Sequence, residues 1–176
     1  MLKSKPIKSE IFLEIDDAII LLLGTNIKGL PWNPEIKGIT RLEKLMFLID
    51  KETEAINWLK DDFEFEAAPF GPFSSKLYQT VDMLLSAELI KERRTISVNN
   101  LDSWEEENLI GIENNSCTMR NFILTQRGEE YYNSLVNDMD KNTLEKISSF
   151  KNTFAFLPIR LLVRYIYSTY PEYTKS

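Results

Sequence analysis

Apolar residues recur every three or four positions over several stretches of the chain, which is the spacing of one helix face. The first stripe consists of Ile15, Ala18, Ile19, Leu22 and Leu23. It predicts a helix over residues 11–23 that closes at Gly24. Similar stripes predict helices from Thr40 to about Thr53, over 75–86, from Thr125 to Met139, over 142–150 and from Pro158 to about Pro171.

Turn residues separate the first two helices. Residues 25–38 are dense in Gly, Pro and Asn and predict a loop. Trp32 in this loop is expected to act as a lid on the core, and a binding role is the less favoured alternative. Thr40 followed by Glu43 has the spacing of a capping box, which would begin the second helix. The charged side chains of this helix are expected on a solvated face; they are Arg41, Glu43, Lys44, Asp50 and Lys51.

The segment after the second helix alternates between apolar and acidic residues. Phe63, Phe65 and Ala67 predict a half-buried strand whose glutamates face solvent rather than forming an acid–base pair. A Pro- and Gly-rich turn follows, and Ser74 or Ser75 can cap the next helix. That helix places Leu77, Val81, Leu84 and Leu85 toward the core. Its outward positions carry mainly short polar side chains.

Two strand-like segments, within residues 87–98 and 118–125, come directly after this helix. A helix followed by a strand pair and a new helix is the order of a winged helix. The predicted fold class is therefore mostly α with a small antiparallel β wing, a winged-helix-like domain with additional C-terminal helices. We expect a single domain: an N-terminal arm at 1–10, a core at 11–140 with an acidic wing insert at 99–116, and C-terminal helices at 141–176 packed on the core.

Composition removes most enzyme classes. The 176 residues include no histidine, which excludes Ser-His-Asp and Cys-His sites and zinc sites built on Cys and His. The lone Cys117 is expected to be a small residue in or near the wing, and it can form no internal disulfide. No phosphate-binding glycine loop or EF-hand is present. We therefore predict no catalytic residue, no metal, no cofactor and no enzymatic activity.

No apolar run approaches the roughly 20 residues that cross a bilayer. Acidic residues interrupt what would be a secretory core near the N-terminus, and the expected location is the cytoplasm. The C-terminal part is expected to be positively charged, through Lys146, Lys151, Arg160, Arg164 and Lys175. A homodimer through the terminal helices is compatible with this sequence.

The first functional hypothesis is a transcriptional or defence-associated regulator that binds double-stranded DNA. Polar residues near the start of a recognition helix meet base edges, and cations of the wing meet phosphates. The candidate DNA-binding residues are Ser75, Lys76, Gln79, Thr80, Arg93, Arg94, Arg120 and Arg127. The formal net charge of −6 and the acidic insert count against this hypothesis, because phosphates repel carboxylates.

The alternative is a protein-interaction subunit that uses the winged scaffold to bind a toxin or another defence subunit. Apolar residues in the insert either fold back on the core or form a patch for a partner. The candidate protein-binding residues are Phe70, Phe73, Trp104 and Leu109. The sequence leaves both hypotheses open, with DNA binding placed slightly ahead because it is the commonest use of the module.

Four segments carry a resemblance to a known family. ITRLEKLMFLID, FEFEAAPFGPFSSKLYQTVDMLLSAELI, FILTQRGEEYY and YIYSTYPEYTKS resemble the YwgA-like group of uncharacterised prokaryotic proteins. The KLMFLID helix and the GPFS turn are more distantly similar to the Panacea (SocA-type) antitoxin domain. The resemblance implies a winged-helix-like, mostly helical fold and a role in regulation, toxin neutralisation or phage defence. It supplies no catalytic residue to transfer.

Overall fold

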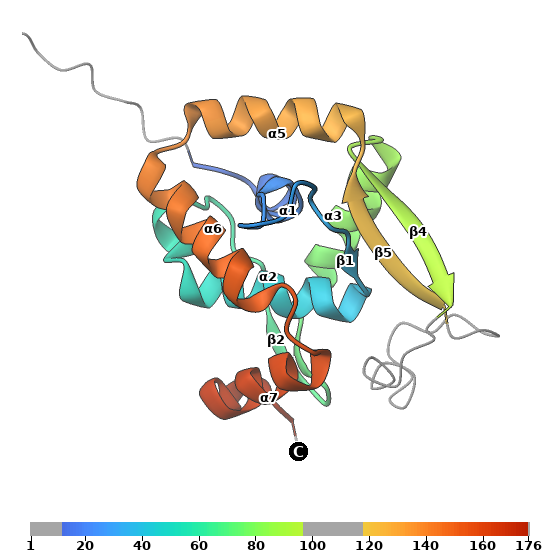
Figure 1. Ribbon diagram of the computed structural model, residues 1–176. Helices are drawn as coiled ribbons and strands as arrows, with labels where there is room; N and C mark the ends of the chain where they lie inside the picture. Colours follow the sequence, from blue (N-terminus) through green and yellow to red (C-terminus); the bar gives the residue numbers. More distant parts are fainter. Residues whose placement is uncertain (1–11, 97–117, 176) are drawn as a thin grey trace, which may run out of the picture.

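The computed structural model describes residues 12–96 and 118–175. The helices are α1 (Ile15–Gly24), α2 (Ile39–Glu52), α3 (Ser75–Ser86), α5 (Gln126–Asp138), α6 (Lys141–Phe154) and α7 (Ile159–Thr169). Two short 3₁₀ helices are η1 (Ala55–Asn57) and η2 (Pro171–Tyr173). Figure 1 shows α1 and α2 in the middle of the molecule, with α5 above them, α6 beside them and α7 below.

A small three-stranded antiparallel sheet lies on one side of these helices, in the order β1-β5-β4 (Figure 1). Its strands are β1 (Ile36–Lys37), β4 (Ile90–Ile96) and β5 (Thr118–Leu124), and a separate hairpin pairs β2 (Glu66–Ala68) with β3 (Gly71–Phe73). The mostly helical class with a small antiparallel sheet is therefore confirmed. In the sheet, Ile36 pairs with Phe122 and both are buried, so that this face packs on the core.

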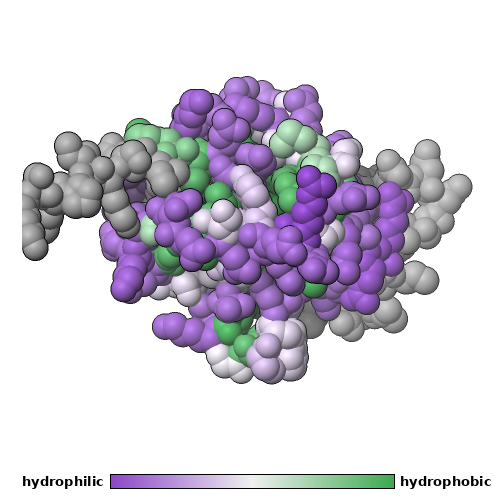
Figure 2. Space-filling view, turned by 90° about the horizontal axis from the view of Figure 1, so that it is seen from above, coloured by the Kyte–Doolittle hydropathy of each residue, from purple (hydrophilic) through white to green (hydrophobic). Residues whose placement is uncertain are grey.

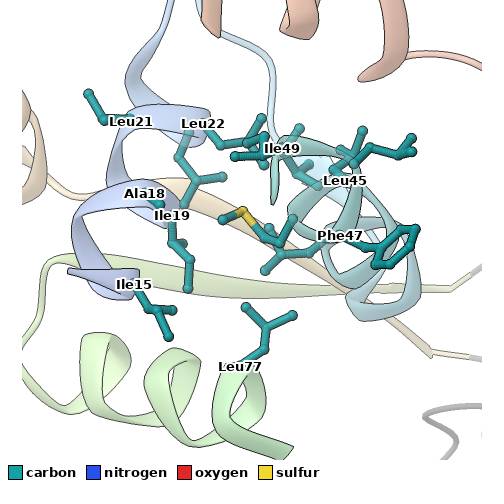
Figure 3. Packing of buried hydrophobic residues seen from close by; sticks show 14 of the residues in the cluster. Ile15, Ala18, Ile19, Leu21, Leu22, Leu45, Phe47, Ile49 and Leu77 are labelled. Carbon is teal, nitrogen blue, oxygen red and sulfur yellow. The ribbon is translucent and has the colours of Figure 1, made fainter. Parts of the chain in front are cut away.

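The two central helices are buried on almost every side. Each residue from Ile39 to Ile49 on α2 is buried, and in α1 only Asp16 is partly exposed. Figure 3 shows side chains of α1, α2 and Leu77 of α3 converging on one cluster. The sequence basis is a run of consecutive apolar residues in each helix, Ala18–Leu23 in α1 and Leu45–Ile49 in α2, which cannot all lie on one stripe. The surface seen from above is mostly hydrophilic (Figure 2).

The start of α2 differs from the prediction. The helix begins at Ile39, and its N-cap is Gly38, whose φ of 92° suits glycine. Thr40 does not cap the helix: its hydroxyl is buried without a hydrogen-bond partner. Glu43 does not reach back to the first turn but contacts Lys44 and the backbone of Ser74. The predicted capping box was wrong because the Glu43 carboxylate binds Lys44 and Ser74 instead of the first turn of α2.

Two predicted caps are confirmed. Ser74 Oγ accepts a hydrogen bond from the Leu77 N–H and begins α3. Thr125 Oγ1 accepts from the Gly128 N–H at the start of α5 and donates to the Glu88 carbonyl at 2.6 Å. A side chain at Gly128 would meet the Leu89 carbonyl oxygen, so the turn after α3 and the start of α5 fit together only with glycine there.

Two other boundaries differ. The strand predicted around Phe63 begins only at Glu66, because Glu64 adopts a left-handed φ of 55° that breaks the extended run. Phe63 is nevertheless fully buried in the core. Pro158 is the N-cap of α7 rather than part of its first turn, and α6 is longer than its predicted stretch.

Candidate functional site

The outward face of α3 is exposed, as the sequence predicts for a recognition helix. We define the α3 face by its exposed residues, Ser75, Gln79, Asp82, Met83 and Ser86. Lys76 and Thr80 are only half-exposed, and the Thr80 hydroxyl donates to the Lys76 carbonyl within the helix. The α3 face therefore carries one carboxylate, a half-exposed methionine and uncharged polar groups.

The lysine beside this face is engaged with acidic neighbours. Lys76 Nζ lies 3.2 Å from a carboxylate oxygen of Glu64 and donates to the carbonyl of Asp62 at 2.9 Å. Both acceptors belong to the segment that leads into β2. The positive charge at the start of α3 is thus balanced by Glu64.

The arginines of the β4-β5 hairpin separate into two groups because side chains alternate along a strand. Arg94 and Arg120 lie opposite each other on β4 and β5, and both bind Glu92, at 3.2 Å and 2.8 Å. Partial burial alone would raise the pKa of Glu92, but the hydrogen bonds and charges of the two arginines hold it below its usual value. Arg93 points to the other face of the hairpin, where it is paired with Glu35.

Arg127 lies apart from both groups, exposed on the first turn of α5 beyond the base of the hairpin. Among the eight predicted DNA-binding residues, the structure brings together Arg94 and Arg120, and separately Ser75 with Gln79 on one helix face. It gives carboxylate partners to Lys76, Arg93, Arg94 and Arg120. Sequence reasoning grouped Arg127 with Arg120 on the returning strand, whereas Arg127 lies on α5, and it did not find the acidic partners of the other four cations.

Two of the four predicted protein-binding residues, Phe70 and Phe73, lie in the described part of the chain. Phe70, at the turn of the β2-β3 hairpin, is 39% exposed. Phe73 is half-buried and packs against Tyr78 with ring centroids 5.5 Å apart. Trp104 and Leu109, with the insert 99–116, lie outside the described residues, as do Cys117 and the arm 1–10.

A buried ion pair on α2 was missed by the sequence analysis, which expected a solvated charged face there. Glu43 and Lys44 are each 2% exposed, and their charged atoms are 3.0 Å apart. Lys44 Nζ also donates to the Pro72 carbonyl at 2.7 Å, and the Ser74 N–H donates to Glu43. Burial raises the pKa of Glu43 and lowers that of Lys44, while their mutual attraction opposes both shifts.

These contacts involve two segments that carry the family resemblance, the GPFS turn and the C-terminal YPEY. The GPFS turn is fixed to α2 through Pro72 and Ser74. The terminal YPEY segment also packs on α2, where the rings of Tyr170 and Tyr173 contact Phe47 with centroids 5.3 Å and 4.8 Å apart. Both motifs therefore contribute to holding the outer elements on the central helix.

A second buried cation, Lys151 on α6, was expected on the positive C-terminal surface. Its ammonium group is fully buried and donates to the carbonyls of Leu23 and Thr25 and to Asn33 Oδ1, at 3.1, 2.6 and 2.7 Å. Burial lowers the pKa of Lys151 to about 7. This side chain joins α6 to the end of α1 and to the loop before β1.

The same loop carries Trp32, which does not cover the core: it is 63% exposed. Instead it lines a cavity of about 750 Å³ between this loop, the sheet and the connection from α6 to α7. Arg41 crosses beneath this connection and donates to the carbonyls of Ala155 and Leu157. The lid predicted for Trp32 was wrong, because its side chain lies at the edge of this cavity and not over the core.

Within residues 12–96 and 118–175, no group of three or more acidic or cysteine side chains is arranged to hold a metal ion. None of the helices in this part of the chain is long and apolar enough to cross a membrane. Comparison with protein-family models, curated proteins and solved structures finds no match. The YwgA-like resemblance stays a prediction.

Proposed function

We propose that this protein is a regulatory protein of the winged-helix type that acts by binding a protein partner through the α3 face. The scaffold assignment is supported by the sheet order β1-β5-β4 and by the order of elements, which is α1-β1-α2-α3-β4-β5 with η1 and the β2-β3 hairpin inserted between α2 and α3. In this arrangement α3 occupies the place of the recognition helix and the β4-β5 hairpin that of the wing. A cytoplasmic location fits the single cysteine.

We choose a protein partner over DNA because of the charge of the α3 face. The α3 face has one carboxylate and, among its five residues, no cation. The cations beside it have carboxylate partners in Glu64 and Glu92. Most non-specific DNA affinity comes from cations that neutralise phosphates, so this surface offers little of that attraction. Met83 is an exposed apolar side chain of a type that is enriched at protein interfaces, so it offers a contact for a protein partner.

The connection between α2 and α3 also favours a protein partner over DNA. Helix-turn-helix proteins that read DNA usually join the two helices by three or four residues. Here residues 53–74 separate them and include η1 and the β2-β3 hairpin. Phe70 at the tip of this hairpin adds an exposed aromatic side chain, of the kind that protein interfaces favour.

Photo-crosslinking in cells tests the proposal. Benzoylphenylalanine replaces Gln79 or Met83 on the α3 face, and Asn137, exposed on α5, is the control position. We expect one protein adduct from positions 79 and 83 that is missing from position 137. A nuclease-sensitive adduct at position 79, the same adducts from all three positions, or no adduct at all would count against a protein partner.

DNA remains the second candidate, because Ser75 and Gln79 are exposed on the first turns of α3 and Arg94 is half-exposed on the wing. Fluorescence polarisation with a labelled duplex over a salt series tests it, using Glu92→Gln to release the arginines from their carboxylate. A DNA-binding protein should lose affinity steeply with salt and gain affinity in this variant. Binding that is absent in both proteins removes this candidate.

A further inference from the structure

The cavity beside Trp32 has the dimensions of a small-molecule site. Its volume of about 750 Å³ lies within the roughly 300–1,000 Å³ typical of ligand pockets. The sheet contributes Lys91, Arg93 and Ile123, and the other walls are the loop 32–35 and the connection at Ala155 and Phe156. Lys91 and Ile123 are direct partners across β4 and β5. Their positions alternate with Ile90 and Leu124, which face the core, so the cavity lies on the other face of the sheet.

Two large aromatic side chains line this cavity without being buried. Trp32 is 63% exposed and Phe156 is 48% exposed. Exposed apolar side chains that gather at one hollow, rather than lying scattered singly, are a mark of ligand-binding grooves. Their ring faces can pack against a planar group, which gains contact area and removes apolar surface from water.

The charge of the cavity is opposite to that of the protein. Lys37, Arg41, Lys91 and Arg93 line it together with one carboxylate, Glu35, although the whole chain has a net charge of −6. Arg93 is paired with that carboxylate, and Arg41 donates to backbone carbonyls. Lys37 and Lys91 are exposed and form no ion pair with another described residue. A local positive field of this kind attracts an anion.

Buried contacts hold the walls of the cavity in place. Asn33, beside Trp32, accepts a hydrogen bond from buried Lys151 and donates one to the Leu23 carbonyl. The other wall is fixed by Arg41, which donates to the carbonyls of Ala155 and Leu157. A site formed before its ligand arrives loses less entropy on binding.

We propose that this cavity binds a small planar anion, an aromatic ring that carries a carboxylate or a phosphate. The ring lies against Trp32 and Phe156, and the anionic group lies between Lys37 and Lys91. This inference is independent of the partner of the α3 face, because the cavity uses the opposite face of the sheet.

The test is a fluorescence titration with 1-anilinonaphthalene-8-sulfonate, which combines aromatic rings with an anionic group. We expect saturable binding of one probe per chain. Lys37→Glu with Lys91→Glu should weaken it by about tenfold or more, because two charge-assisted contacts become repulsive. The charge-matched control is Lys28→Glu with Lys141→Glu, two exposed lysines outside the cavity, and it should stay within about twofold of wild type. Trp32→Ala should weaken binding by a similar factor to the lysine variant.

Competition defines the ligand class. Benzoate or AMP should displace the probe, whereas benzyl alcohol and adenosine at the same concentrations should not. Displacement by benzoate alone or by AMP alone supports the proposal and identifies the preferred anionic group. Equal affinity in wild type and the lysine variant, equal displacement by the neutral compounds, or no saturable binding would overturn it. Thermal melts confirm that each variant is folded, and the lysine variant decides the matter if Trp32→Ala does not fold.

Discussion

Lys44 on α2 and Lys151 on α6 are both buried lysines, but their surroundings differ in one respect. Lys44 has a carboxylate partner, Glu43, and one backbone carbonyl. Lys151 has three neutral oxygen acceptors and, among the described residues, no carboxylate. Each fastens an outer segment to the central helices: Lys44 holds the GPFS turn, and Lys151 holds the loop that carries Trp32.

The difference shows two ways in which a fold compensates a buried cation. An ion pair is neutral as a unit, but it requires both members, since either charge alone would be buried without compensation. A cation at the C-terminal end of a helix is stabilised by the last carbonyls and the helix dipole. Lys151 uses this second solution at the end of α1, where Leu23 and Thr25 provide the carbonyls. It can lose its proton without leaving an opposite charge behind.

Breaking the ion pair should give the largest effect. Glu43→Gln keeps the size of the side chain but leaves the Lys44 ammonium buried opposite a neutral group. We expect the free energy of unfolding to fall by about 3–5 kcal/mol, measured by urea denaturation.

The control for this variant is Glu64→Gln, which neutralises the exposed partner of Lys76. It should cost no more than about 1 kcal/mol. Adding Lys44→Met to Glu43→Gln should recover part of the loss, because the uncompensated charge is removed. A double variant that is as unstable as the sum of its parts would show that the two charges are not coupled.

Replacing Lys151 should lower the free energy of unfolding by less than Glu43→Gln does. Lys151→Met leaves three oxygen acceptors without their donor but also removes a buried charge. We expect a loss of about 2 kcal/mol in the same denaturation experiment. Hydrogen exchange should show faster exchange in the loop 25–35, since Asn33 loses its contact with α6. An unchanged loop in a destabilised protein would contradict the fastening role.

The two lysines also predict a pH dependence that separates them. Burial lowers the pKa of Lys151 from 10.5 in the unfolded chain to about 7. Between these values the unfolded chain binds a proton that the folded chain does not, so the free energy of unfolding rises with pH. The slope reaches about 1.4 kcal/mol per pH unit. Below pH 7 both states are protonated, and this contribution is constant.

Urea denaturation of wild type and Lys151→Met from pH 6 to 9.5 measures this slope. The pKa of Lys44 is lowered as well, but that contribution is present in both proteins and cancels in their difference. The free energy of unfolding of wild type minus that of Lys151→Met should therefore increase above pH 7. Lys141→Met, at an exposed position on the same helix, is the control and should follow wild type. A difference that is flat over this range would show that Lys151 keeps its proton in the folded protein.

Local patterns predicted the elements but not the burial of charge. Spacing and caps gave α3, the β4-β5 hairpin and the start of α5, since these depend on neighbouring residues such as Ser74 and Thr125. The burial of Glu43 and Lys44 depends on α6, α7 and the β2-β3 hairpin, which cover α2 from distant parts of the chain. A signal was present: five consecutive apolar residues, Leu45 to Ile49, cannot share one stripe.

The candidate sites show the same limit. The sequence predicted the exposure of Ser75 and Gln79, because the opposite face of α3 is apolar. It did not predict that Arg93 would meet Glu35, since 58 residues separate them. The cavity beside Trp32 was missed for the same reason, as its walls come from four separate parts of the chain.

The smallest effect is expected at Ser74, which links the ion pair to α3. Ser74→Ala removes the N-cap of α3 and the buried hydrogen bond from Ser74 Oγ to the Phe63 carbonyl, and should cost about 1–2 kcal/mol. Ser75→Ala, at the exposed neighbouring position, should change stability little. Ser74→Ala keeps the backbone N–H that donates to Glu43 but removes the hydroxyl that fixes this turn, so Ser74→Ala and Glu43→Gln should be coupled by more than about 0.5 kcal/mol. Ser74→Ala and Lys151→Met share no partner, so their effects should add. Additivity in both pairs would mean that the ion pair and the cap are separate, and that Lys44 fastens the turn through Pro72 alone.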